Sequence, residues 1–95
     1  MQASVQLMPD LVEKETITSS NFTVKDSIPQ HSELMDQIKA ATRLGNAFRG
    51  KVYIYFEDDE GPKYVNTTIW AYGLKYICLK GGVWIPINRI SEIKY

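Results

Sequence analysis

Residues 51–95 alternate apolar and polar side chains in short runs, and this pattern constrains the fold more than any other feature. Alternation places successive side chains on opposite faces of a β-strand. Turn-forming residues separate the runs, which predict five strands at residues 51–57, 63–72, 75–80, 83–87 and 91–95. Five short strands joined by hairpins are typical of a small antiparallel barrel.

The breaks between these runs contain residues that favour turns. The acidic segment at residues 58–62 predicts a solvated hairpin tip, and Gly81-Gly82 predicts a tight hairpin turn. Pro86 lacks a backbone N–H, so its strand should lie at a sheet edge. Residues 88–90 are short enough for a single 3₁₀ turn before the last strand.

The alternation also indicates which strand residues face the core. The predicted inward side chains in the first four strands are Val52, Ile54, Phe56, Val65, Thr67, Ile69, Ala71, Ile77, Leu79, Val83, Ile85 and Ile87.

A helix is predicted over residues 32–44, where Leu34, Ile38 and other apolar residues recur at near-helical spacing. Ser32 is a plausible N-cap residue, and Gly45 is a natural residue for ending the helix. The apolar stripe is narrow, so we expect this helix to lie on a partner surface.

Residues 1–30 show no sustained apolar period and include a Ser/Thr-rich stretch. We expect a flexible N-terminal arm, within which residues 17–24 are the best candidate for a short strand or docking segment. Residues 31–95 then form a helix-plus-barrel domain. The fold class is therefore mainly β with one N-terminal helix.

Charge and size disfavour several functions. Eleven basic residues balance eleven acidic ones, whereas general nucleic-acid and membrane-surface binders need a basic excess. A chain of 95 residues leaves little room for both a core and a deep catalytic pocket. Cys78 and His31 are the single cysteine and histidine, so no metal site, cofactor or catalytic set is predicted.

The start of the chain lacks the basic and apolar regions of a secretory signal, and no run is long enough for a transmembrane helix. We therefore expect a cytoplasmic protein that is not bound to a membrane.

The tract from Tyr76 to Ile93, with its strand, tight turn, strand and short turn, resembles the second motif of the Sm-like small β-barrel. An SH3-like barrel shares the proline-containing fourth strand and the 3₁₀ turn. The segments 52–57, 67–70 and 79–90 also resemble a group of short bacterial proteins to which no activity is assigned. The RNA-chaperone branch of the Sm-like family has Lys-His in the turn where this chain has Asn88-Arg89, and Thr68 stands where a bend-forming glycine is common.

Seven aromatic side chains lie at predicted outward positions and are the candidate binding residues on a shared surface: Tyr53, Tyr55, Tyr64, Trp70, Tyr72, Tyr76 and Trp84. Such a surface suits a peptide, a protein or stacked bases. Alternatively, the helix, the N-terminal segment or a second subunit covers it.

We expect a non-enzymatic interaction module that forms a homo-oligomer or binds a protein or peptide through this aromatic face. The alternative is a single-stranded nucleic-acid (RNA) binding protein of Sm-like type. In that case Lys75, Lys80 and Arg89 would contact phosphates while tyrosine and tryptophan side chains stack on bases.

Overall fold

The computed structural model describes residues 8–24 and 26–95. Along these residues the chain forms, in order, β1 (Asp10–Leu11), η1 (Lys14–Thr16), η2 (Ser19–Asn21), α1 (Leu34–Phe48), β2 (Val52–Asp58), β3 (Gly61–Thr67), β4 (Ile69–Tyr72), β5 (Tyr76–Leu79), β6 (Val83–Pro86), η3 (Ile87–Arg89) and β7 (Ile90–Lys94). Here η denotes a short 3₁₀ helix. The expected mainly β fold with one helix is confirmed.

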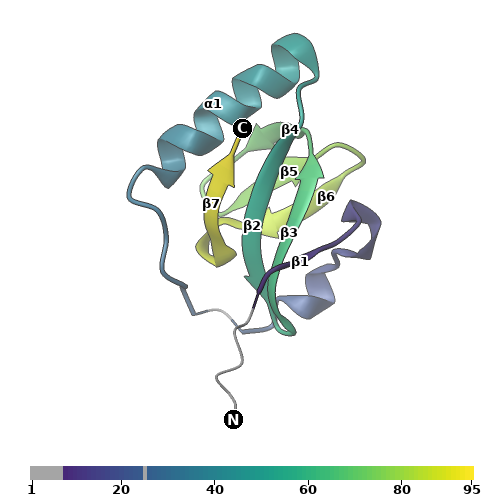
Figure 1. The fold of residues 1–95 in the computed structure, drawn as a ribbon, viewed down its shortest axis with the longest axis vertical. Helices are drawn as coiled ribbons and strands as arrows, with labels where there is room; N and C mark the ends of the chain where they lie inside the picture. Colours follow the sequence, from purple (N-terminus) through teal and green to yellow (C-terminus); the bar gives the residue numbers. More distant parts are fainter. Residues whose placement is uncertain (1–7, 25) are drawn as a thin grey trace.

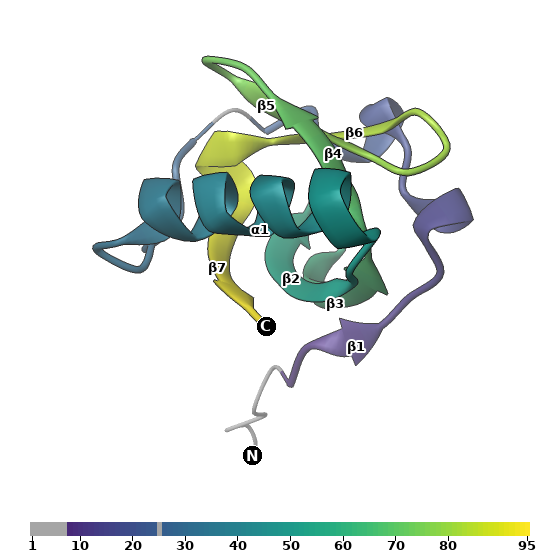
Figure 2. The same ribbon diagram turned by 90° about the horizontal axis from the view of Figure 1, so that it is seen from above.

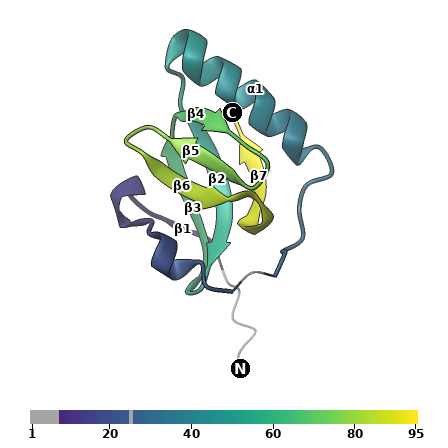
Figure 3. The same ribbon diagram turned by 180° about the vertical axis from the view of Figure 1, so that it is seen from behind.

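The strands pair into two separate sheets. One has the order β1-β3-β2-β7 and the other the order β4-β5-β6. All pairs are antiparallel except β1 with β3. From behind, β4, β5 and β6 cross in front of β2 and β3 (Figure 3). The closed barrel expected from the sequence is not confirmed, because the strand pairing does not join the two sheets into one.

The run predicted as one strand at residues 63–72 is divided between the two sheets. β3 ends at Thr67, β4 begins at Ile69, and Thr68 between them is buried. The Thr68 carbonyl accepts a hydrogen bond from the Lys80 N–H at 3.0 Å. The chain bends at Thr68 because the residues before and after it pair with different strands.

The two sheets and α1 enclose one apolar core. Most predicted inward side chains are confirmed, and those of β2 and β5 are at most 1% exposed: Val52, Ile54, Phe56, Ile77 and Leu79. Ala71 is instead exposed, because the β4–β5 register shifts between Ile69 and Ala71.

The helix lies across one end of the sheets (Figure 1) and packs mainly against β4 and β7. Seen from above, it spans the width of this end (Figure 2). Its buried residues include Leu34, Ile38 and Ala41, as the apolar spacing predicts. Two predicted boundaries are wrong: Glu33 rather than Ser32 precedes the helix, and the helix continues past Gly45 to Phe48.

Gly45 has a packing role rather than an end-of-helix role. A Cβ atom at this position would collide with the Ile69 carbonyl oxygen and the Thr68 side chain. The helix ends instead at Arg49, whose φ of 55° lies in the left-handed region. Glycine at position 45 therefore permits the helix backbone to approach the start of β4.

The N-terminal segment follows the outside of the first sheet. β1 pairs in parallel with β3, and the Val12 N–H extends this pairing to the Tyr64 carbonyl at 2.9 Å. Ile17 is buried in the core, and Phe22 packs against Phe56 with ring centroids 6.0 Å apart. The candidate docking segment at residues 17–24 thus contributes two side chains to the apolar interior.

We expect Gly45→Ala to lower the free energy of unfolding by about 1–3 kcal/mol, because the added methyl group would collide with the backbone carbonyl of Ile69, which cannot turn aside as the end of a flexible side chain can. Urea denaturation of the full chain measures this change. Gly73→Ala is the matched control, since a Cβ atom there would contact nothing within 4 Å. Equal stabilities of the two variants would contradict this packing role.

Candidate functional site

The seven candidate aromatic residues do not share one surface. They fall on the outer faces and edges of two different sheets. Neither α1 nor the N-terminal segment covers all of them, and the exposed members are Tyr53, Trp70, Tyr72, Tyr76 and Trp84.

Three tyrosines form a cluster on the outer face of the β2–β3 hairpin. The Tyr55 and Tyr64 rings stack with centroids 5.0 Å apart, and Tyr53 lies 6.1 Å from Tyr64. The Lys94 ammonium lies 5.2 Å from the Tyr55 ring centroid, within cation–π range. The three rings cover much of one another's surface, and of the three only Tyr53 is exposed.

A second aromatic group lies on the β4-β5-β6 sheet. Tyr76 and Trp84 meet edge to face with centroids 6.4 Å apart, and about half of each side chain is exposed. Tyr72 pairs with buried Ile77, so it lies on the face opposite Trp84. Tyr76 and Trp84, which we call the β5–β6 aromatic pair, are therefore the candidates that offer apolar surface together.

The basic strip expected from Lys75, Lys80 and Arg89 is also divided. Lys80 lies beside a smaller cavity with Arg49, Thr68 and Trp70. Lys75 and Arg89 border a groove of about 430 Å³, which we call the Arg89 groove. Its lining residues are Phe22, Val24, Gln30, Leu74, Lys75, Tyr76, Pro86, Ile87, Asn88 and Arg89.

Tyr76 belongs both to the groove and to the β5–β6 aromatic pair. Leu74, at the tip of the β4–β5 hairpin, is fully exposed at one side of the groove. The groove and the aromatic pair therefore form one continuous surface on the second sheet.

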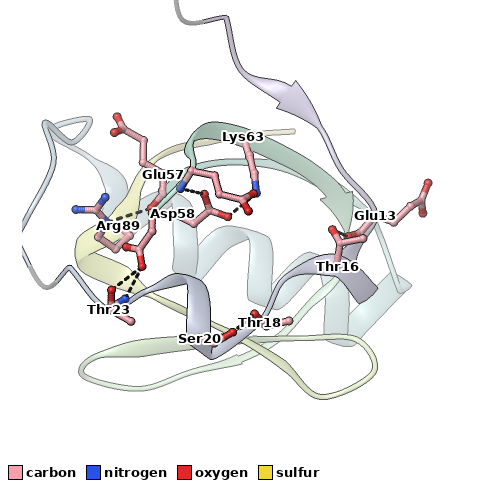
Figure 4. Close-up of polar contacts among 11 residues, drawn as sticks. Glu13, Thr16, Thr18, Ser20, Thr23, Glu57, Asp58, Lys63 and Arg89 are labelled. Atoms are coloured by element: carbon pink, nitrogen blue, oxygen red, sulfur yellow. Dashed lines mark hydrogen bonds and ion pairs between the residues drawn. The ribbon is translucent and has the colours of Figure 1, made fainter.

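Unlike a typical surface arginine, Arg89 is buried, with only 7% of the residue exposed. Its Nε donates to the Glu57 carbonyl at 3.0 Å (Figure 4). One terminal nitrogen donates to the Asp26 carbonyl at 2.7 Å. All eleven acidic residues of the chain lie in the described part, and none places a carboxylate within 4.0 Å of this guanidinium. Arginine is rarely so buried without an ionic partner.

Residues of the N-terminal segment form one wall of the groove, which the sequence did not predict. Gln30 donates to the carbonyls of Ile87 and Ile90 at 2.7 and 3.1 Å. Nearby, the Ile28 N–H donates to the Asn88 carbonyl at 3.2 Å. These bonds join residues about sixty positions apart, so no local pattern in the sequence could indicate them.

Asp59 fastens the segment that supplies Phe22 and Val24. Its carboxylate accepts hydrogen bonds from the Thr23 hydroxyl at 2.6 Å, the Thr23 N–H at 3.1 Å and the Val24 N–H at 3.3 Å. The Thr23 hydrogen bonds hold the pKa of Asp59 below its ordinary value of 3.8, and the charge of Arg89 adds to the effect. The acidic hairpin tip therefore anchors the groove wall.

The expectation of a solvated hairpin tip is wrong at Asp58, which is buried, whereas Asp59 and Glu60 are exposed. The Asp58 carboxylate pairs with Lys63 Nζ at 2.6 Å and accepts the Glu60 N–H at 2.9 Å (Figure 4). Lys63 also contacts the exposed Glu60 carboxylate at 2.5 Å. Burial lowers the pKa of Lys63, but the bonds with both carboxylates outweigh burial and leave it above the ordinary 10.5.

The described residues, 8–24 and 26–95, contain no group of three or more acidic, cysteine or histidine side chains placed to hold a metal ion. No helix in this part of the chain is long and apolar enough to cross a membrane. Cys78 is half-buried on β5 opposite Trp84. The Arg89 groove thus presents one buried cation, one exposed cation and a lining that is mostly apolar.

No protein-family model, curated protein or solved structure matches this chain. The resemblance to Sm-like and SH3-like barrels stays a prediction.

We expect acid to release the groove wall at Thr23 and Val24. The depressed pKa of Asp59 means that its contribution is complete above pH 3.8 and is lost as the pH falls through the lower native pKa. Hydrogen-exchange protection factors of the Thr23 and Val24 amides, followed by NMR, measure this release. In Asp59→Asn the same amides should be less protected from exchange at neutral pH. Protection factors that change neither at low pH nor in Asp59→Asn would show that Asp59 does not hold this segment.

We expect Lys63→Met to lower the free energy of unfolding by about 3–5 kcal/mol, because it leaves the buried Asp58 carboxylate without its cation. Glu60→Gln is the control, since that carboxylate is exposed and its removal should change stability by less than about 1 kcal/mol. Thermal and urea denaturation measure both variants. A small effect of Lys63→Met would show that the ion pair is dispensable.

Proposed function

We infer that this chain is a small non-enzymatic module that binds a partner protein or peptide through the second sheet. The observation that supports this most directly is the continuous surface of the β5–β6 aromatic pair and the Arg89 groove. Exposed aromatic side chains beside a groove are typical of peptide-recognition surfaces, and tryptophan and tyrosine often dominate binding energies.

Self-association through sheet edges is disfavoured at β6. The Ile87 N–H donates to the Lys75 carbonyl, so the backbone groups of Ile87 point toward β5. Along a strand, the backbone groups of every second residue point to the same side. Ile85 therefore faces β5, while Trp84 and Pro86 face the open edge. Because Pro86 has no N–H, the edge offers a second chain little to pair with.

Self-association through the outer edge of β7 is disfavoured as well, because residues before and within α1 already form hydrogen bonds with this edge. His31 N–H donates to the Ser91 carbonyl at 2.7 Å, and Ile93 N–H donates to the Gln37 side chain at 3.0 Å. A ring of subunits joined edge to edge would have to break these bonds. A partner bound on the outer face of the second sheet meets no such obstacle.

Single-stranded nucleic acid is the second candidate, because Lys75 and Arg89 border one groove with Tyr76. Two cations provide few phosphate contacts, and Lys80 lies at a different cavity. The balanced charge of the chain gives no long-range attraction for a polyanion. A protein partner therefore fits the surface better.

Selection of random displayed peptides on the full chain, followed by calorimetry, tests this proposal. We expect Trp84→Ala to weaken selected peptides by about tenfold or more, because it removes half of the aromatic pair. Tyr53→Ala, an exposed aromatic residue on the other sheet, is the control and should have little effect.

Two results would overturn the proposal. One is a failure to enrich any peptide whose binding depends on Trp84. The other is tight binding of a thymidine decanucleotide that falls steeply with salt, which would favour the nucleic-acid alternative. A solution mass that rises with concentration in the native chain but not in Trp84→Ala would instead identify a second copy as the partner.

A further inference from the structure

We propose that the Arg89 groove binds an acidic side chain of the partner, flanked by apolar residues, so that the partner carboxylate pairs with Arg89. The inference rests on the function proposed above and specifies the chemistry that this surface recognises. Three observations support it: the unpaired burial of Arg89, the charge of the groove and its apolar lining.

The first observation is that Arg89 is more than nine-tenths buried. No carboxylate in the described part of the chain lies within 4.0 Å of its guanidinium, so Asp59 acts on it only from a longer distance. Two carbonyls accept from two of its five N–H donors. Within residues 8–24 and 26–95, no other hydrogen bond of its guanidinium is found. Nε is occupied, so the terminal nitrogens provide the donors that remain. A carboxylate is the planar acceptor that arginine binds best.

The second observation is that the groove lining is cationic and contains no acidic residue. Lys75 is exposed beside the groove, so a carboxylate bound to Arg89 would experience a second positive charge. The Asp59 carboxylate, which interacts electrostatically with Arg89, is already hydrogen-bonded to Thr23 and Val24. The charge complementarity therefore favours an anionic ligand, and the acidic hairpin tip nearby favours a single carboxylate over a polyanion.

The third observation is that, apart from the amides Gln30 and Asn88, the remaining lining residues are apolar or aromatic. Phe22, Tyr76, Pro86 and Ile87 line the groove beside Arg89, and Leu74 is exposed at one side. A volume of about 430 Å³ is enough for a few side chains. The occupant that satisfies both features is an aspartate or glutamate between apolar residues, with the neighbouring Trp84 as further contact surface.

Titration of the ¹⁵N-labelled full chain with capped tripeptides tests the proposal. The probes are acetyl-Leu-Glu-Leu-amide and acetyl-Phe-Glu-Phe-amide, and each has a matched peptide with glutamine in place of glutamate. We expect the glutamate peptides to shift the Arg89 Nε–H signal and the backbone amides of residues 74–76 and 87–89. The glutamine peptides should bind at least about tenfold more weakly, because they lose the charged hydrogen bonds.

Two variants locate the site. Lys75→Gln should weaken the glutamate peptides about threefold to tenfold and leave the fold intact, because Lys75 is exposed. Lys80→Gln is the matched control and should have no effect, since Lys80 lies beside the other cavity. Arg89→Lys retains the charge but loses the planar fork, and circular dichroism shows whether it folds. If Arg89→Lys does not fold, the comparison of Lys75→Gln with Lys80→Gln still shows whether the glutamate peptides bind at this groove.

Several outcomes would overturn the inference. Equal binding of the glutamate and glutamine peptides would exclude carboxylate recognition. If selected peptides still depended on Trp84, the proposed function would stand while this inference failed. Binding of benzoate at Arg89 with none of the peptides bound would point to a small organic acid rather than a protein. Binding of the thymidine decanucleotide at the same amides, with no peptide bound, would refute both proposals.

Discussion

The bend at Thr68 is the constraint on which the rest of the fold depends. There one run of chain leaves the first sheet and enters the second, and the Thr68 carbonyl is bonded to the turn between β5 and β6. The helix approaches the same point through Gly45, and the Thr68 hydroxyl donates to the Arg49 carbonyl at 3.4 Å. Both sheets and the helix are thus positioned relative to one another by a few residues.

Arg89 has a corresponding position at the other end of the molecule. Its guanidinium reaches backbone carbonyls of β2 and of the segment before α1, while Gln30 holds the turn that contains it. The groove is therefore composed of residues from three parts of the chain that meet around one buried charge. Such a site is rigid where Arg89 lies and adaptable where Leu74 is exposed, a combination suited to recognising one anchor residue within a varied partner.

Local patterns in the sequence predicted the strands after residue 50, the helix and most of the core, because alternation and helical spacing depend only on neighbouring residues. They did not predict β1. They placed Pro86 correctly on an edge strand and Gly81-Gly82 in a turn where both residues have positive φ. They failed at Thr68, Gly45 and Asp58, where a contact from a distant segment decides the conformation. The candidate site was predicted in part for the same reason: Lys75, Tyr76, Trp84 and Arg89 were identified, whereas Phe22, Gln30 and the burial of Arg89 were not.

The parallel pairing of β1 with β3 has a consequence for the order in which the molecule assembles. Its partners, Asp10 with Lys63 and Leu11 with Tyr64, are more than fifty residues apart. During synthesis, β1 emerges before the β2–β3 hairpin and must wait for it before it can dock, and Ile17 and Phe22 stay uncovered meanwhile. The groove is therefore completed only after residues 86–89, which line it together with Phe22 and Val24, have been synthesised.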